Sequence, residues 1–434
     1  MQTKAKEKIN IVTLGCAKNL VDSEVLMTQL KGNKKDVFHQ REDINPDIVI
    51  INTCGFIDKA KQESIDTILK HAKEKEEGII KKLYVTGCLS ERYKDDLKTD
   101  IPEVDGFYGT RDLPELLKNF EAKYRNELLG DRIITTDSHY AYLKISEGCD
   151  RPCSFCAIPL MRGRHISKPI DQIILEAKNL VRNGVREIML IAQDSTYYGI
   201  DIYKKRAMSE LLKKLSDVEG LDWIRIHYAY PAGFPMDIIE VMRERDNICN
   251  YLDIPLQHGS TNMLKVMKRG ITREKTDELI KNIRDINPEI ALRTTLIAGH
   301  PGETERDFQE MYDFVERSQF DRLGIFTYSH EEGTSAHKLE DDVPEQVKRS
   351  RSNKIMALQQ KISTEKNKNK VGKTVKVLID RVDANNYYGR TEQDSPEVDN
   401  EVIIPSKEMH LRVGDFYDVK ITDSKEYDLI GKVD

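Results

Sequence analysis

The chain has 434 residues, of which 39% are hydrophobic and 33% are charged, and its net charge at pH 7 is −6. At about 100–200 residues per domain this length predicts several domains, and the acidic balance excludes a general attraction to nucleic acid. The apolar stretch at residues 11–14 is far shorter than a secretory signal or a membrane span. We therefore predict a cytoplasmic protein that does not associate with membranes.

Residues 1–130 predict a parallel α/β domain. Apolar runs that read as strands alternate with polar, helix-like stretches, and the runs are INIVTLGC, DIVIINTCGF and KLYVTGCLS. Cys16, Cys54 and Cys88 each stand just past such a run. Loops at the carboxyl ends of parallel strands share one edge of the sheet, where ligands bind, so we expect the three cysteines to lie together. The alternative is that all three are buried core residues.

Residues 135–365 predict a second α/β unit, an open barrel of about six β/α repeats. Its expected strands are AYLKIS, REIMLIAQD, WIRIHYAYP, YLDIPLQHG, ALRTTLIAGHPG and RLGIFTYSH. The polar residues Gln193, Gln257 and Arg293 lie in or near the carboxyl halves of these strands, where barrel chemistry is expected. An amphipathic helix over residues 344–370 then connects to a small all-β barrel within residues 366–434.

Six of the seven cysteines fall at positions that indicate metal or redox chemistry, because structural disulfides are rare in a reducing compartment. Cys249 stands alone and is predicted to be a small buried hydrophobe. Cys149, Cys153 and Cys156 form a C-x3-C-x2-C loop after the first barrel strand. Three thiolates can hold three irons of a cubane cluster and leave the fourth iron open for an exogenous amino acid.

Two other metal sites compete with the cubane. Structural zinc normally takes four ligands, usually as two pairs, and His165 is the available fourth ligand here. A ferredoxin-like electron carrier would need a fourth cysteine close to the triad, and the local sequence lacks one. Both are therefore less favoured than an open-site cluster.

The motif CSFC, with Phe155 before the last cysteine, resembles the signature of radical-SAM enzymes. The motifs TLGCAKNLVDSE, NTCGFI and TGCLSERY resemble the amino-terminal domain of the methylthiotransferases in that superfamily, and the last unit resembles their TRAM domain. The resemblance implies two 4Fe–4S clusters, one on Cys149, Cys153 and Cys156, and an auxiliary one on Cys16, Cys54 and Cys88.

The same resemblance implies that S-adenosylmethionine binds the open iron, with Phe155 near its adenine. One S-adenosylmethionine would methylate a sulfur held at the auxiliary cluster, and a second would give the 5′-deoxyadenosyl radical that activates the substrate carbon. We expect Gln193, Gln257 and Arg293 to be candidate S-adenosylmethionine contacts, although each could equally be a structural hydrogen-bonding residue. An electron donor and a sulfur source are the further partners that this chemistry requires.

The stretches GCDRPCSFCAIPLMRG and GRTEQDSPEVDN resemble the protein-modifying branch of the family, which implies methylthiolation of the β-carbon of an aspartate in the twelfth small-subunit ribosomal protein. Residues 371–434 carry nine Lys and Arg against 14 Asp and Glu, a net charge of −5. An RNA-binding barrel should be basic, so direct nucleic-acid binding is not expected. We expect the acidic stretch at residues 392–401 to dock a basic protein, although it could simply be a solvated loop.

Two other functions remain as alternatives. A transfer-RNA adenosine methylthiotransferase would need a basic cleft made by the other domains. A non-catalytic iron–sulfur module would not cleave S-adenosylmethionine.

Overall fold

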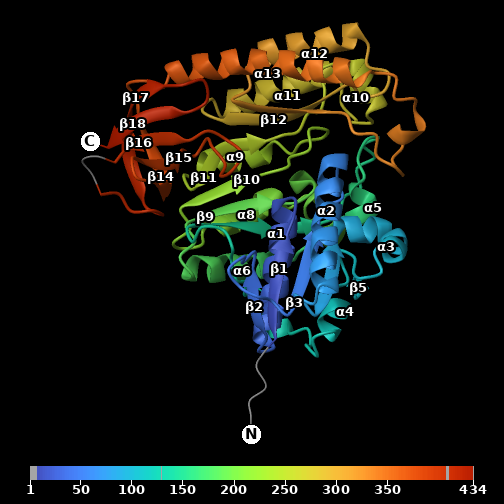
Figure 1. The fold of residues 1–434 in the computed structure, drawn as a ribbon. Helices are drawn as coiled ribbons and strands as arrows, with labels where there is room; N and C mark the ends of the chain where they lie inside the picture. Colours follow the sequence, from blue (N-terminus) through green and yellow to red (C-terminus); the bar gives the residue numbers. More distant parts are fainter. Residues whose placement is uncertain (1–6, 129, 407–409, 434) are drawn as a thin grey trace.

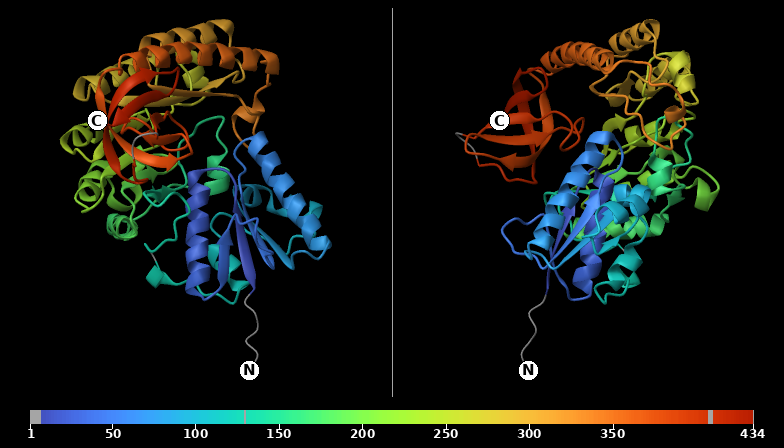
Figure 2. Two further views of the ribbon diagram at one scale, coloured as in Figure 1. Left: turned by 60° about the vertical axis from the view of Figure 1, so that its left-hand side comes forward. Right: turned by 45° about the vertical axis from the view of Figure 1, so that its right-hand side comes forward.

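The computed structural model of the chain describes residues 7–128, 130–406 and 410–433. Figure 1 shows an amino-terminal α/β unit in blue, a central α/β unit in green to yellow, and a small β-barrel in red. A long orange helix runs over the central unit toward the barrel, and the other views show the same arrangement (Figure 2). Within the described ranges no helix combines the length and the apolar character needed to cross a membrane.

The amino-terminal unit is a parallel five-stranded sheet in the order β2-β1-β3-β4-β5. Every residue of β3 is buried, because helices cover both faces of the sheet. The strands are β1 (Lys8–Thr13), β2 (Asp36–His39), β3 (Ile48–Thr53), β4 (Lys82–Gly87) and β5 (Gly106–Phe107). The helices are α1 (Ala17–Gly32), α2 (Asp58–Glu76), α3 (Cys88–Asp100), α4 (Leu113–Lys118) and the 3₁₀ turn Asn126–Leu128.

The central unit is a parallel six-stranded sheet in the order β13-β12-β11-β10-β9-β6, which confirms the open barrel of six units. Its strands are β6 (Tyr140–Lys144), β9 (Glu187–Ile191), β10 (Trp223–Ile226), β11 (Ile248–Asp253), β12 (Ala291–Ala298) and β13 (Arg322–Thr327). The main helices are α6 (Ile170–Arg182), α8 (Met208–Ser216), α9 (Asp237–Glu244), α11 (Arg273–Ile286) and α12 (Glu305–Ser318). The shorter elements are β7 (Ser146–Glu147), α5 (Ile158–Arg162), β8 (Ile166–Ser167), α7 (Ile200–Tyr203), α10 (Thr261–Val266), and the 3₁₀ turns Ser195–Tyr197 and Ala336–Lys338.

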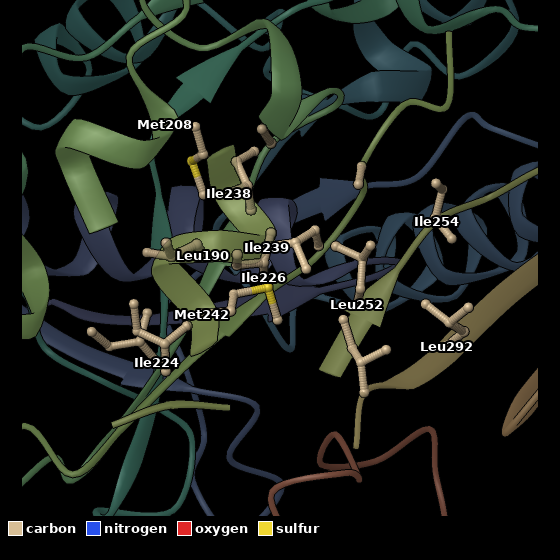
Figure 3. Packing of buried hydrophobic residues seen from close by; sticks show 14 of the residues in the cluster. Leu190, Met208, Ile224, Ile226, Ile238, Ile239, Met242, Leu252, Ile254 and Leu292 are labelled. Carbon is tan, nitrogen blue, oxygen red and sulfur yellow. The ribbon is translucent and has the colours of Figure 1, made fainter. Parts of the chain in front are cut away.

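The main hydrophobic core lies between this sheet and its helices. Ile224 and Leu252 come from neighbouring strands, and Ile239 and Met242 reach them from α9 (Figure 3). All four are almost completely buried. Burying one such side chain contributes about 1.5–3 kcal/mol, so this core fixes the strands whose carboxyl ends carry the candidate site.

Helix α13 (Glu345–Lys368) confirms the predicted connecting helix and buries Ile355, Leu358 and Ile362 against the central unit. After it the chain forms a closed barrel in the order β14-β15-β16-β18-β17. The strands are β14 (Thr374–Val382), β15 (Asn386–Arg390), β16 (Val402–Pro405), β17 (Phe416–Ser424) and β18 (Leu429–Val433). Strand β15 was not predicted, because NYYGR lacks the apolar alternation that marks the other four strands.

Two carboxylates of the acidic stretch, Asp394 and Asp399, are not free to dock a partner, whereas Glu397 is exposed, so the expected docking surface is reduced to part of the stretch. Asp394 is 2% exposed and accepts a hydrogen bond of 2.9 Å from Nε of Arg322 in β13. Asp399 accepts bonds from Arg293 (3.2 Å) and from the hydroxyl of Tyr251 (2.8 Å). The carboxylates therefore pair with the central unit of the same chain.

The strand residues of the central unit continue this interface. Glu187 in β9 accepts hydrogen bonds of 2.8 Å both from Arg225 in β10 and from Arg390 in β15. Cys249 packs beside it in an apolar cluster with Trp223 and is 1% exposed, which confirms that it is a small buried hydrophobe. The small barrel is therefore held against the central unit by buried ion pairs.

Candidate active site

The three amino-terminal cysteines lie at the carboxyl ends of three neighbouring strands. Cys16 caps α1 directly after β1, Cys54 follows β3, and Cys88 opens α3 after β4. Strands β1, β3 and β4 are adjacent and parallel, so the cysteines share one edge of the sheet as predicted. Cys54 and Cys88 are buried, whereas Cys16 is exposed.

Gly15 lets two of these loops approach each other. Its φ is +89°, and a Cβ built on it would lie 2.8 Å from Sγ of Cys54. A side chain at this position would therefore fill the space beside the sulfur and strain the backbone. The glycine keeps the loop that carries Cys16 close to Cys54.

The second triad lies on the loop between β7 and α5. The backbone N–H of Cys149 donates to the carbonyl of Gly163 (3.0 Å), and that of Ser154 donates to the carbonyl of Met267 (3.0 Å). Gly148 has φ +76°, and a Cβ there would lie 2.0 Å from the carbonyl oxygen of Arg164. The loop is thus held against its neighbours at both ends of the triad.

Nitrogen donors point at the sulfurs of this loop. Nη1 of Arg269 donates to Sγ of Cys153 at 3.1 Å, and the backbone N–H of Arg151 donates to Sγ of Cys149 at 3.4 Å. Both guanidinium groups lie over the ring of Tyr230, at 4.1 Å from its centroid for Arg151 and 4.3 Å for Arg269. Such donors stabilise negative charge on sulfur, which is the charge that a metal-ligating thiolate carries.

Burial makes the free thiols reluctant to ionise. It raises the pKa of Cys149 to about 11 and those of Cys156 and Cys88 to about 12, and it also raises the pKa of Cys54. Iron would therefore have to displace the protons as it binds. Across residues 7–128, 130–406 and 410–433, no three His, Cys, Asp or Glu side chains are grouped as a site for a single metal ion. The donors aimed at Cys149 and Cys153 fit the single iron–sulfur cluster that a radical-SAM loop holds.

The segments that carry the two triads pack directly on each other. Cys88 forms a small apolar cluster with Ala157 and Met161, which follow the second triad in the chain. Helix α3, which begins at Cys88, lies against α5. Arg162, the last residue of α5, crosses this contact and donates from Nε to Sγ of Cys88 at 3.3 Å. Cys88 of the first triad therefore lies beside the segment that follows the second triad.

Three of the residues predicted to contact S-adenosylmethionine lie on the second triad loop or just after a strand of the central sheet. Phe155 is in the second triad loop, with its ring centroid 6.4 Å from that of His300. Gln193 follows β9 and donates to Glu147 (3.0 Å), while its Oε1 is buried without a partner. Gln257 follows β11 and has φ +75°, a strained value for a residue other than glycine.

Arg293 is placed differently from the prediction. It is the third residue of the eight-residue strand β12, in its amino-terminal half. Its guanidinium donates to Asp253 (3.2 Å) and to Asp399 (3.2 Å). The structure therefore favours the alternative that Arg293 is a structural hydrogen-bonding residue, which links the central sheet to the acidic stretch.

Sequence reasoning missed the basic residues around the sulfurs. The side chains of Arg162 and Arg269 each donate to a cysteine sulfur that is distant in the chain, whereas Arg151 donates to the nearby Cys149 through its backbone N–H. Arg151 and Arg162 do lie within the motif stretch GCDRPCSFCAIPLMRG, which was the one available signal.

Family models match three parts of the chain. Residues 143–315 match the radical SAM superfamily, residues 371–433 match the TRAM domain, and residues 8–109 match the uncharacterized protein family UPF0004. The solved structure of the radical S-adenosylmethionine methyltransferase TsrM from Kitasatospora setae has a TM-score of 0.55 and 14% identity, covering 74% of this chain and 75% of that one. At that identity the likeness shows a shared fold only.

Curated relatives match over the full length. The ribosomal protein uS12 methylthiotransferase RimO of Cytophaga hutchinsonii is 59% identical, over 99% of this chain and 98% of the relative. The proteins of the same name from Christiangramia forsetii and Bacteroides fragilis are 58% and 54% identical, with at least 96% of each chain covered.

Proposed function

The chain belongs to the RimO family of radical-SAM methylthiotransferases, and from this premise we propose that it methylthiolates the β-carbon of an aspartate in ribosomal protein uS12. The curated relatives are named for that ribosomal protein. The aspartate is proposed from the resemblance of the triad stretch and of GRTEQDSPEVDN to the protein-modifying branch.

One observation carries the proposal. One cysteine triad follows strands of the amino-terminal sheet and the other lies on a loop of the central unit, and the segments that hold them pack against each other through Cys88, Ala157 and Met161. A reaction that both activates a carbon and delivers sulfur needs two sites close together. The contact of Cys88 with the segment after the second triad supports that arrangement.

When bound, a cluster on Cys149, Cys153 and Cys156 supplies the electron that cleaves S-adenosylmethionine, and a second cluster on Cys16, Cys54 and Cys88 holds the sulfur to be transferred. Around the first set, Arg269 and the backbone N–H of Arg151 orient two of the sulfurs. Phe155 is proposed to lie against adenine, and the unpaired Oε1 of Gln193 is a free acceptor for a ligand N–H or O–H.

Gln257 is the other proposed contact, since its strained backbone lies at the carboxyl end of β11. Arg293 is left out because two carboxylates already hold its guanidinium. The reaction consumes electrons and sulfur, so an electron donor and a sulfur source complete the proposed partners.

The test is mass spectrometry of ribosomal proteins and transfer RNA from cells with and without this chain. We expect one aspartate of uS12 to carry a methylthio group only when the chain is present. Methylthiolated adenosine in transfer RNA that depends on the chain, with uS12 unmodified, would contradict the proposal and favour the transfer-RNA branch. An unmodified pool of both would favour a non-catalytic module.

A further inference from the structure

Arg162 is a buried cation that no step of the proposed function has used. Its side chain is 2% exposed, although arginine rarely lies so deep unless it is paired. It ends α5 in the central unit, yet most of its partners belong to the amino-terminal unit. The residue therefore spans the contact between α5 and the amino-terminal unit.

Each nitrogen of the guanidinium has its own partner. Nε donates to Sγ of Cys88 at 3.3 Å, and Nη1 donates to Asp22 at 2.6 Å and to Glu147 at 3.3 Å. Nη2 donates to Oδ1 of Asn19. Because the fork is planar and rigid, the bonds to Asn19 and Asp22 fix the direction in which Nε points.

The charged side chains around Arg162 neutralise one another even when the charge of the Cys88 sulfur is left out. Lys144 contacts both Asp22 and Glu147, at 2.6 Å to the latter, so two cations face two carboxylates. The N–H aimed at Cys88 is then an oriented donor in a buried, charge-neutral setting, where a hydrogen bond is stronger than in water. Such a donor on a ligating sulfur favours the more negative, reduced state of an iron–sulfur cluster.

The same contact also orients the ligand loops. Asn19 lies in the first turn of α1, three positions after Cys16, and its Oδ1 is 3.7 Å from Sγ of Cys88. Glu147 lies two positions before Cys149 and accepts a bond from Gln193. One guanidinium thus ties the loops of both triads together.

We propose, on the basis of the proposed function, that Arg162 is a positioning residue for the auxiliary cluster. It holds the Cys88 sulfur toward the central unit and raises the reduction potential of the cluster bound there. Lysine cannot replace it, because a single ammonium group cannot donate hydrogen bonds to the sulfur, the amide and the carboxylates at the same time, as the planar guanidinium does.

The test uses the full chain with Cys149, Cys153 and Cys156 replaced by alanine, so that any cluster observed is the auxiliary one. This parent is compared with versions that add Arg162→Gln, Arg162→Lys or Arg164→Gln. Arg164 is the matched control, since its side chain is 89% exposed and its removal changes the net charge by the same amount. Each protein is reconstituted anaerobically with iron and sulfide and titrated electrochemically, with the reduced cluster followed by electron paramagnetic resonance.

We expect Arg162→Gln to lower the equilibrium constant for one-electron reduction at least tenfold, a fall of about 59 mV in midpoint potential. Arg162→Lys should also lower it, while Arg164→Gln should match the parent. Loss of the cluster in both Arg162 variants, with the circular dichroism unchanged and Arg164→Gln fully loaded, would support the positioning role in a stronger form.

A loaded Arg162→Lys protein with the potential of the parent would overturn the inference and leave the proposed function intact. A parent that binds no cluster at all would instead contradict the auxiliary cluster of the proposed function, and the inference with it. The two failures are therefore distinguishable.

Discussion

The cysteine loops and the acidic stretch at residues 392–401 are both conspicuous in the sequence, but they lie in different environments in the structure. Cys16, Cys54 and Cys88 lie at the ends of neighbouring strands, as their positions predict, and Cys149, Cys153 and Cys156 lie on one loop of the central unit. Asp394 and Asp399 of the acidic stretch, in contrast, turn inward and pair with Arg322 and Arg293 of the same chain. A rare residue type at a regular strand-end position indicates chemistry, whereas a charge run does not reveal whether its partner lies in another molecule.

The largest expected effect is on the second triad. Replacing Cys149, Cys153 and Cys156 by alanine should remove about half of roughly eight irons and abolish 5′-deoxyadenosine formation, because the ligands of one cubane are gone. Iron analysis and chromatography of the products check this result. Cys249→Ala is the control, since that thiol is buried in an apolar cluster, and it should leave both quantities unchanged. Reductive cleavage that survives in the triple variant would refute the assignment of this triad.

The next effect separates an internal ion pair from a docking surface. Asp394→Ala leaves Arg322 buried without its carboxylate, so the free energy of unfolding in urea should fall by about 3–5 kcal/mol. The exposed Asp418 of β17 offers a control of the same charge, and Asp418→Ala should change stability by no more than about 0.5 kcal/mol. If Asp394→Ala instead kept its stability and only lost affinity for uS12, the docking role would be restored.

The smallest effect is a pH dependence. Burial alone would raise the pKa of Asp394, but the guanidinium of Arg322 outweighs it and holds the pKa below the usual range. A depressed pKa contributes stability that is complete above the unfolded value of about 3.9 and is lost as the pH falls toward the folded value. Urea unfolding between about pH 6 and about pH 3 should therefore show Asp394→Asn losing less stability in acid than the wild type. Parallel curves for the two proteins would contradict the ion pair.

The sequence predicted features that depend on local pattern. The strands before Cys16, Cys54 and Cys88 and the helix at Glu345–Lys368 follow from apolar periodicity within a few residues. The partners of Arg162 could not be predicted from the sequence, because Cys88 lies 74 positions away and contacts Arg162 only through the packing of two units. Strand β15 was missed for a related reason, since its pairing with β14 and β16 rather than its own composition makes it a strand.

The division of labour between the triads is tested most directly by alanine at Cys16, Cys54 and Cys88, with two products measured on one preparation. The variant is incubated with S-adenosylmethionine, reductant, sulfide and uS12, and both 5′-deoxyadenosine and methylthiolated uS12 are quantified. We expect 5′-deoxyadenosine to form, because the second triad and its donors are intact, and no methylthiolated uS12 to appear. A normal yield of methylthiolated uS12 would show that the first triad does not hold the transferred sulfur and would contradict the account.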